Sequence, residues 1–475
     1  MMKYFLTSCV IVLLLISSIT PNVLASSEED DDAVTFIGFH NVATMPYNLS
    51  DNTATTFNEE FSGSTGGPRI YLVGGCTADQ ICEYENQTVN DAIFCFCPTI
   101  TNKCMYFEPE TETWSTNCQD APTPRYRHMA AKVGEYLFVA GGRTVEDNLI
   151  TTVERYDPAT DTWTNPFNWS AASSDGAAFA NGNTLYLVGG YDATYNTLTT
   201  LTAFDTTTGA IDTSLSGMQL GRGDIAAIPF DGDYYVVGGW SATTSNNWCD
   251  PSNDVEKYNI ATDTWTTMQS LNHSRGDLVL GVMDDGIFAV GGEKKQEGDA
   301  TCTYSVPVDH VERFLGSTEL WNDEEDIPAN LFRFSGAYYN STYSDGETGE
   351  HTSGIYLFGG QGTYDATTMT YPLKGSTIKY VPASTVSSSG GGSSGLSEGG
   401  LAGVVIAAVV LVGLIIAAVV AALIYYQAGY AKLDDDEGTA DVEMANAATT
   451  TGTAGAVVTT GAGNDDEDVE ITFNK

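Results

Sequence analysis

The feature that most constrains the fold of this chain is a short apolar segment that ends in two glycines and occurs six times. Its first copy reads Ile-Tyr-Leu-Val-Gly-Gly at residues 70–75. The further copies lie at residues 136–142, 185–190, 234–239, 287–292 and 355–360. Successive glycine pairs are 67, 48, 49, 53 and 68 residues apart. An internal repeat of about 50 residues predicts a chain built from copies of one supersecondary unit.

A second signature follows the glycine pairs. In three repeats an aromatic residue precedes a tryptophan by seven positions, and in the first repeat Tyr106 precedes Trp114 by eight. The three pairs are Tyr156 with Trp163, Tyr258 with Trp265, and Phe314 with Trp321. Turn-forming residues at 157–160 and 259–262 separate the partners, which predicts two strands joined by a hairpin.

On these segments the chain resembles the kelch-repeat family across residues 32–382. The resemblance implies an all-β fold, a six-bladed kelch-type β-propeller whose blades each have four antiparallel strands running outward from a central channel. The second strand of each blade would end at the glycine pair. Its near-continuous apolar sequence suits a strand that neighbouring blades bury on both faces. The glycines and the aromatic pairs are then scaffold, and we assign them no chemistry.

The sixth repeat stops before its fourth strand. An apolar segment at residues 34–39, followed by Met45 and Pro46, precedes the first repeat and resembles the end of a blade. We expect it to pair with residues 377–381, so that an N-terminal strand closes the ring and removes the open sheet edge.

The two ends of the chain predict an exported, single-pass type I membrane protein. Residues 1–25 have the composition of a cleaved signal peptide. Residues 401–426 are an uncharged apolar run, long enough to cross a bilayer as one transmembrane helix. The propeller ectodomain would span residues 26–382, with a Gly/Ser linker at 383–400. We expect it to be extracellular or lumenal, with the plasma membrane favoured over internal membranes.

The charge balance is strongly acidic, with 19 Lys and Arg against 62 Asp and Glu. Such a chain repels nucleic acid and attracts cationic partners or divalent ions, although solubility alone also explains the excess. Residues 427–475 are acidic and low in complexity, which predicts a disordered cytoplasmic tail. Within this tail, Tyr430 and Leu433 resemble a tyrosine-based sorting signal, so a sorting or cargo receptor is one alternative function.

Eight cysteines remain after removal of the signal peptide, which predicts four disulfides in an exported protein. Cys249 and Cys302 each lie 10 residues after a glycine pair, and we expect them to bridge the loops of blades four and five. The other six crowd a cystine-rich insertion at residues 76–118 of blade one and allow 15 connectivities. They are Cys76, Cys82, Cys95, Cys97, Cys104 and Cys118. Their spacing does not match a zinc site, so we expect no metal.

Five acceptor sequons are consistent with a glycosylated exterior. They start at Asn48, Asn86, Asn168, Asn272 and Asn340.

Four of the nine arginines stand just before the predicted first strand of a blade, with Ser174 at the corresponding place in blade three. They are Arg127, Arg222, Arg275 and Arg333. The resemblance implies that arginines at this place line the channel mouth and hold acidic peptides through bidentate contacts. The alternative is structural: these arginines tie loops together through carbonyl groups and acids such as Asp224 and Asp277.

An extracellular enzyme on the same scaffold, either a galactose-oxidase-like oxidase or a glycan-acting enzyme, is a second alternative. A galactose-oxidase-like copper site needs two histidines, two tyrosines and a free cysteine, whereas the five histidines here fall in different repeats without a close pair. We therefore predict no catalytic residue and no cofactor. The favoured function is a recognition module that binds an extracellular protein, peptide or glycan at the loop face of the propeller.

Overall fold

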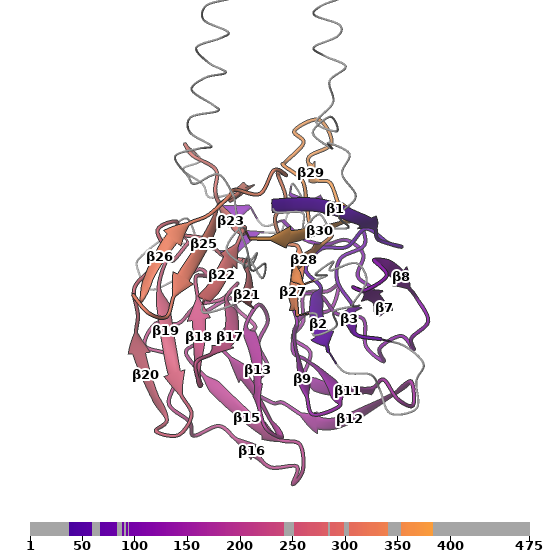
Figure 1. Ribbon diagram of the computed structural model, residues 1–475. Coiled ribbons are helices and arrows are strands. Elements are labelled where there is room, and N and C mark those ends of the chain that lie inside the picture. Colours follow the sequence, from indigo (N-terminus) through magenta and orange to yellow (C-terminus); the bar gives the residue numbers. More distant parts are fainter. Residues whose placement is uncertain are drawn as a thin grey trace, which may run out of the picture. The chain divides into compact units, whose positions relative to one another are not determined.

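The computed structural model describes residues 38–58, 67–82, 88–89, 92–93, 95–241, 251–283, 286–298, 304–340 and 353–382. Six four-stranded antiparallel sheets stand around a central channel, and the first strand of each sheet contacts the first strands of its neighbours (Figure 1). The six-bladed propeller is therefore confirmed.

The blades contain these strands, given from the channel outward. Blade one consists of β2 (Thr53–Phe57), β3 (Arg69–Val73), β7 (Cys104–Glu108) and β8 (Thr113–Ser115). Blade two consists of β9 (Met129–Val133), β10 (Tyr136–Ala140), β11 (Thr152–Asp157) and β12 (Thr162–Asn168). Blade three consists of β13 (Ala177–Asn181), β14 (Thr184–Val188), β15 (Leu201–Asp205) and β16 (Ile211–Asp212). Blade four consists of β17 (Ala226–Phe230), β18 (Asp233–Val237), β19 (Val255–Asn259) and β20 (Thr264–Thr267). Blade five consists of β21 (Val279–Met283), β22 (Gly286–Val290), β25 (Val311–Leu315) and β26 (Leu320–Asp323). Blade six consists of β27 (Ser335–Tyr339), β28 (Gly354–Phe358), β30 (Ser376–Val381) and β1 (Gly38–Thr44).

Six short strands lie in the connections between second and third strands. They are β4 (Gln80–Ile81), β5 (Thr88–Val89), β6 (Ala92–Ile93), β23 (Glu293–Lys295), β24 (Ser305–Pro307) and β29 (Thr370–Tyr371). Because strands alternate in direction within a blade, these connections emerge at the same end of the propeller as the connections between blades. We call this end the loop face.

The apolar second strands form the core, as the sequence predicts. Their side chains are buried between adjacent sheets, and the glycine pair lets the backbones of neighbouring blades approach closely. At Gly190, with φ of 88°, a Cβ atom would lie 2.3 Å from the carbonyl oxygen of Ser174. A side chain at this position would force the two backbones apart.

The predicted aromatic pairs join strands three and four and also link successive blades. The rings of Tyr156 and Trp163 have centroids 5.0 Å apart. The indole Nε1 of Trp163 then donates a hydrogen bond to the carbonyl of Gln119, which lies before blade two, at 2.8 Å. Trp265 repeats the contact with Ser216 at 2.7 Å. These tryptophans therefore tie each outer strand to the connection that precedes its blade.

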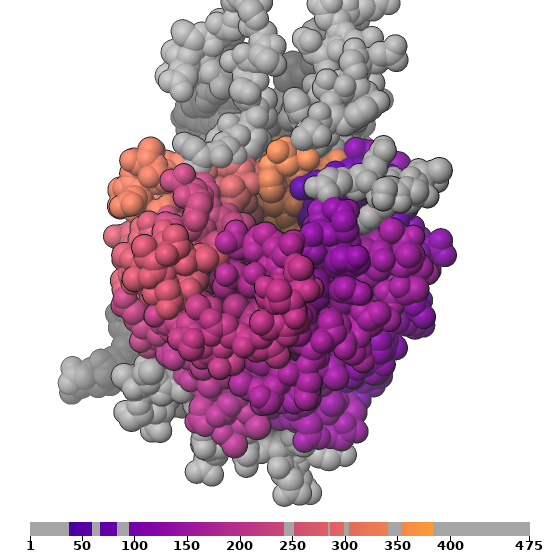
Figure 2. Space-filling view, turned by 90° about the horizontal axis from the view of Figure 1, so that it is seen from below, coloured from indigo at the N-terminus to yellow at the C-terminus, as the bar shows by residue number. Residues whose placement is uncertain are grey.

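The N-terminal strand closes the ring, with one correction to its position. β1 pairs with β30 from Gly38 opposite Val381 to Thr44 opposite Ser376. The predicted partner is right, but the strand runs to Thr44 rather than ending at residue 39, because the turn begins only at Met45, whose N–H donates to the carbonyl of Gly375 at 2.8 Å. Figure 2 shows the blades following one another around the propeller, from purple through magenta to salmon, with orange residues of blade six between the salmon and purple blades.

Three disulfides hold the first blade and settle the connectivity that the sequence leaves open. Cys76 pairs with Cys97, Cys82 with Cys95, and Cys104 with Cys118. The extra residues of this repeat lie between β3 and β7, while β7 and β8 are ordinary blade strands. Two of the disulfides therefore fold a loop on the loop face, and the third joins the start of β7 to the chain beyond β8.

Several sequence predictions fall outside the described residues. These are the signal peptide, the linker at 383–400, the apolar run at 401–426, the tail with Tyr430 and Leu433, the pair Cys249 and Cys302, and Asn86. Among the residues that are described, none belongs to a helix long and apolar enough to span a membrane. The other four sequon asparagines are exposed, and their glycosylation stays a prediction.

Candidate functional site

Six residues, one from the segment before each first strand, form a ring at the channel mouth. All six have left-handed backbone conformations, with φ between 51° and 57°. In blade order they are Asp51, Arg127, Asp175, Asp224, Asp277 and Arg333, and we call them the mouth ring. The left-handed conformation costs a non-glycine residue roughly 1–2 kcal/mol, so its recurrence in six blades marks a shared structural requirement.

Backbone hydrogen bonds explain that requirement. The N–H of Arg127 donates to the carbonyl of Asp51 at 2.9 Å, and the N–H of Asp175 donates to the carbonyl of Arg127 at 2.9 Å. Asp224 continues the series to Asp175 at 2.7 Å and Asp277 to Asp224 at 2.9 Å, while Asp51 donates to Arg333 at 3.2 Å. Five backbone hydrogen bonds therefore join the six residues in series, and all six residues line the cavity in the channel.

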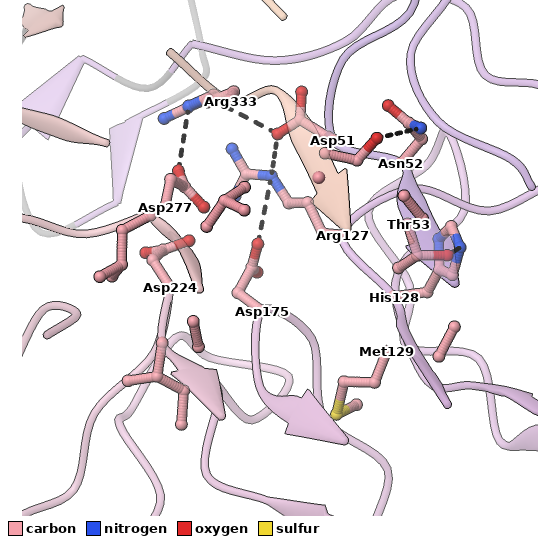
Figure 3. A pocket seen from close by; sticks show the side chains of 18 of the residues that line it. Asp51, Asn52, Thr53, Arg127, His128, Met129, Asp175, Asp224, Asp277 and Arg333 are labelled. Atoms are coloured by element: carbon pink, nitrogen blue, oxygen red, sulfur yellow. Dashed lines mark hydrogen bonds and ion pairs between the residues drawn. The ribbon is translucent and has the colours of Figure 1, made fainter. Parts of the chain in front are cut away.

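The side chains of the mouth ring surround a cavity of about 230 Å³ (Figure 3). Residues of the first strands and those directly before them line the rest of the cavity, among them His128, which precedes β9. Burial lowers the pKa of His128 to about 3, and the nearby Arg125 guanidinium contributes to the shift. His128 is therefore neutral near pH 7, and its Nε2 shares a hydrogen bond of 2.9 Å with the hydroxyl of Thr53.

Ion pairs connect five members of the mouth ring in series. Arg333 lies 3.4 Å from Asp277 and 3.9 Å from Asp51. Arg127 lies 3.7 Å from Asp51 and 3.8 Å from Asp175. These pairs span four of the six intervals of the ring, and their side chains are buried or partly buried, the most exposed being Asp277 at 23%.

Asp224 occupies the interval between the two ends of this series. Its Oδ2 accepts a hydrogen bond of 2.6 Å from the hydroxyl of Tyr191. Burial raises the pKa of Asp224 well above its ordinary value, and repulsion by Asp277 and Asp175 raises it further, against a smaller lowering by Arg127. The pKa values of Asp175 and Asp277 are also raised, chiefly by burial. This side of the ring therefore crowds three carboxyl groups into a poorly solvated space, where burial and mutual repulsion disfavour their ionisation.

A second ring supports the first. It consists of the residue that follows each glycine pair, and each member bridges to the segment before the first strand of its own blade. The six residues are Cys76, Arg143, Tyr191, Trp240, Glu293 and Gln361, and we call them the support ring.

Most support-ring side chains reach the mouth segment of the following blade. Tyr191 of blade three contacts Asp224 of blade four, and Glu293 of blade five accepts bonds of 3.0 and 3.2 Å from Arg333 of blade six. Gln361 of blade six donates to Asp51 of blade one at 3.3 Å. The orientation of the mouth ring is thus fixed by buried polar contacts rather than by solvent.

The four predicted arginines do not share one position, which corrects the sequence interpretation. Arg127 and Arg333 belong to the mouth ring, but Arg222 and Arg275 have no exposed surface. Arg222 lies 2.9 Å from Glu256 and donates to the carbonyl of Gly238 at 2.7 Å; Arg275 lies 2.9 Å from Glu312. For these two, the structure has the loop-tying arrangement of the structural alternative.

Arg125 has the same arrangement, 2.7 Å from Glu154, and is also fully buried. We call the three pairs of Arg125, Arg222 and Arg275 with their glutamates the blade locks. The sequence contains the signal that separates them from the mouth ring. Each blade-lock arginine precedes the first glycine of its pair by 16 residues, whereas Arg127, Asp175, Asp224 and Asp277 precede theirs by 14.

The structure also corrects the prediction that no two histidines are close. His273, before blade five, stacks on His310, near the start of β25, with ring centroids 3.7 Å apart. The two come from different connections, so their separation in sequence hides the contact. Beside them, Asp309, His310 and Asp326 have ligand atoms within 4.8 Å of one another, the set among the described residues that could hold a metal ion. Both aspartates are exposed, and the set lies outside the cavity.

Comparisons with known proteins agree with the architecture. Residues 62–292 match the family described as "KLHDC2/KLHL20/DRC7 Kelch-repeats domain". Kelch-like protein terF of Aspergillus terreus is 27% identical over 291 residues, 56% of this chain and 61% of that protein. Kelch-like protein 15 of Homo sapiens is 26% identical over 212 residues, 40% of this chain and 34% of that protein.

The chain thus spans between about a third and three-fifths of the length of these curated relatives. A solved structure titled "Structure of YjhT" superimposes with a TM-score of 0.52 at 12% identity, covering 71% of this chain and 97% of its own. At that identity the likeness concerns the fold alone.

Proposed function

Because the chain belongs to the kelch-repeat β-propeller family, we propose that it is a recognition module that binds a protein partner at the loop face, around the mouth ring. The mechanism is non-covalent. Rigid blades hold loops of different length and composition, and the contacts of those loops select the partner. The observation that carries the proposal is the convergence of the irregular connections on one end of the channel, where the cavity and its charged side chains lie.

The loops of blades five, six and one are fastened to one another, which favours a preformed surface. β29 of blade six pairs with β4 of the blade-one loop. Tyr371 of β29 receives a hydrogen bond of 2.8 Å from the N–H of Ser305, in the blade-five loop. Its ring lies 5.3 Å from both Phe332 and Tyr364. Loops held in this way lose little conformational freedom when a partner binds, which favours affinity.

Exposed apolar side chains are also present on the loop face. Tyr47, Val145 and Met369 are 41%, 45% and 42% exposed, and all three lie in connections at this end. Apolar and aromatic side chains that stay accessible beside polar groups are typical of the centre of a protein interface. Two comparable residues, Ile211 and Leu320, lie at the opposite end, next to the turns that join strands three and four.

We further propose that the propeller works outside the cytoplasm, on a single-pass type I membrane protein, with the plasma membrane favoured. This part rests on the sequence of residues 1–25 and 401–426. Disulfides in blade one support an oxidising compartment. A peptide or glycan ligand would use the same face.

The test compares matched surface changes in the full chain. Partners are captured by cross-linking on cells that express the wild-type protein, identified, and then titrated against purified variants. Val145→Asp with Met369→Asp, on the loop face, should weaken binding by at least about tenfold, since both changes introduce charge into an apolar contact. Leu320→Asp with Ile211→Asp, at the opposite end, should leave it unchanged. Equal effects of the two pairs would contradict the proposal.

A further inference from the structure

The charges of the mouth ring do not alternate. In blade order they run acid, base, acid, acid, acid, base, so each arginine lies between two aspartates, but the position of blade four holds Asp224 where strict alternation would place a third cation. Four aspartates face two arginines, and Glu293 adds another carboxylate against Arg333. The surplus charge is therefore confined to one sector, formed by blades three to five.

One acid of this sector, Asp175, has unused hydrogen-bonding capacity. The side chain of Asp175 is only 5% exposed, yet its Oδ2 has no hydrogen-bond partner among the described residues. Figure 3 shows Asp175, Asp224 and Asp277 turned toward the same space. A buried carboxylate oxygen without a donor is unfavourable, so a donor supplied from outside would be bound there with a net gain.

The support ring is also incomplete at this sector. Tyr191 provides a donor to Asp224, but the corresponding residue of blade four is Trp240. Its indole Nε1 is buried without a hydrogen-bond partner among the described residues and lies against Gly276, the neighbour of Asp277. Asp277 therefore lacks a donor like the one that Tyr191 gives Asp224, whereas Arg333 and Asp51 receive polar contacts from Glu293 and Gln361.

We propose that the mouth ring binds one cationic group of a partner protein, the guanidinium of an arginine or the ammonium of a lysine, beside Asp224 and between Asp175 and Asp277. The proposal rests on the proposed function and names the chemistry that the loop face recognises. The bound cation would complete the alternation of charge around the ring, and its N–H groups would donate to the carboxylate oxygens.

The dimensions favour a side chain over a metal ion or a larger ligand. The cavity of about 230 Å³ is smaller than the 300–1,000 Å³ usual for small-molecule sites, so one long side chain suits it better. The three acids do not form a cluster with ligand atoms close enough for one metal, unlike Asp309, His310 and Asp326 elsewhere on the described part of the chain. A strongly acidic protein also attracts cationic partners over distance.

A cation here should bind more tightly as the pH rises. Burial raises the pKa of Asp224, and an added positive charge favours its ionised form. Several other charged or titratable groups act on this carboxyl. They are Asp175, Asp277, Glu293, Arg127 and Tyr191. Burial raises the pKa of Tyr191 well above its ordinary value, so tyrosine ionisation does not compete.

The experiment titrates the purified full chain with pentapeptides whose central residue is arginine, lysine, citrulline or norleucine and whose other residues are glycine, with blocked ends. Citrulline keeps the shape of arginine without its charge. We expect the arginine or lysine peptide to bind at least about tenfold more tightly than its neutral counterpart, and Asp224→Asn to remove the difference. Calcium chloride and guanidinium chloride serve as separate probes for a metal and for a free small cation.

The control is Asp231→Asn, which changes an aspartate of the same left-handed conformation, with φ of 51°, in a turn at the opposite end of blade four. It should leave the titration unchanged. Equal binding of the arginine and citrulline peptides, or no binding of either charged peptide up to about 10 mM, overturns the proposal. So does tighter binding of calcium than of any peptide. If a captured protein partner binds wild type and Asp224→Asn alike, this inference fails while the proposed function stands.

Discussion

In three blades the arginine of a blade lock lies two positions before a residue of the mouth ring, yet the two sets of residues differ in how their charges are balanced. The blade locks, such as Arg222 with Glu256, pair each buried guanidinium with one buried carboxylate and with backbone carbonyls. The mouth ring gathers four aspartates around two arginines and leaves Asp224 between two further acids. Compensated charge in a packed interior serves the fold, whereas uncompensated charge that faces a cavity is held at a cost to stability and is available to a ligand.

The largest expected effect comes from breaking a blade lock. Arg222→Ala removes the partner of Glu256, whose side chain is 3% exposed, and leaves a buried carboxylate unpaired. We expect the free energy of unfolding to fall by about 3–5 kcal/mol, measured by urea denaturation. Arg155→Ala, which removes a partly exposed arginine stacked on Tyr136, should cost less than about 1 kcal/mol. Similar losses in the two variants would contradict the distinction.

Combining Arg222→Met with Glu256→Met sharpens this result. Replacing both partners removes the unpaired charge, so the double variant should be more stable than Arg222→Ala. If it is equally destabilised, the loss comes from packing and not from the orphaned carboxylate.

His128, beside both sets of charges, should make the propeller sensitive to acid. Its pKa is lowered to about 3 by burial and by Arg125, below the ordinary value of about 6.5. The unfolded chain therefore takes up a proton as the pH falls through 6.5 while the folded chain does not. Stability should decline by about 2 kcal/mol between pH 7.5 and pH 5 from this residue.

The measurement is the thermal midpoint of wild type and His128→Gln at both pH values. Glutamine does not titrate in this range, so the variant should lose less stability on acidification than wild type does. The same acid loss in both proteins would contradict the assignment.

Asp224 should show the opposite pH dependence, with a smaller effect. Its pKa in the folded chain is raised, so its contribution to stability is fully present below about pH 3.9 and is lost as the pH rises through the folded value. Asp224→Asn should therefore stabilise the unliganded protein at pH 7 by about 0.5–2 kcal/mol, with the gain vanishing at low pH. A loss of stability at pH 7 would place Asp224 among the purely structural residues.

The sequence predicts the scaffold because its signals are local and repeated. Each glycine pair and each aromatic pair sets a strand in the same register, and the missing fourth strand of blade six requires a partner such as β1. The cysteine pairing is different, because several connectivities satisfy the same spacing and the structure alone shows Cys76 joined to Cys97.

The sequence interpretation includes two of the six mouth-ring residues, Arg127 and Arg333, but not the four aspartates. Arginines are rare in this chain, so the sequence interpretation selects Arg222, which lies two positions before the ring residue Asp224. A constant spacing of 14 residues to the glycine pair identifies four of the six members. Asp51 and Arg333 do not follow it, because longer connections separate their first and second strands. The ring and its cavity also depend on left-handed backbone conformations, which no residue pattern in this sequence predicts.

Calorimetric titration of the full chain with the central-arginine pentapeptide at pH 7, in two buffers of different ionisation enthalpy, tests directly whether a cation binds beside Asp224. A cation that binds beside Asp224 should drive protons off the mouth-ring aspartates, so the observed heat should depend on the buffer and show proton release. Asp224→Asn should bind more weakly and release fewer protons. Buffer-independent heat, with the same affinity in wild type and Asp224→Asn, would show that no cation binds at the mouth-ring aspartates.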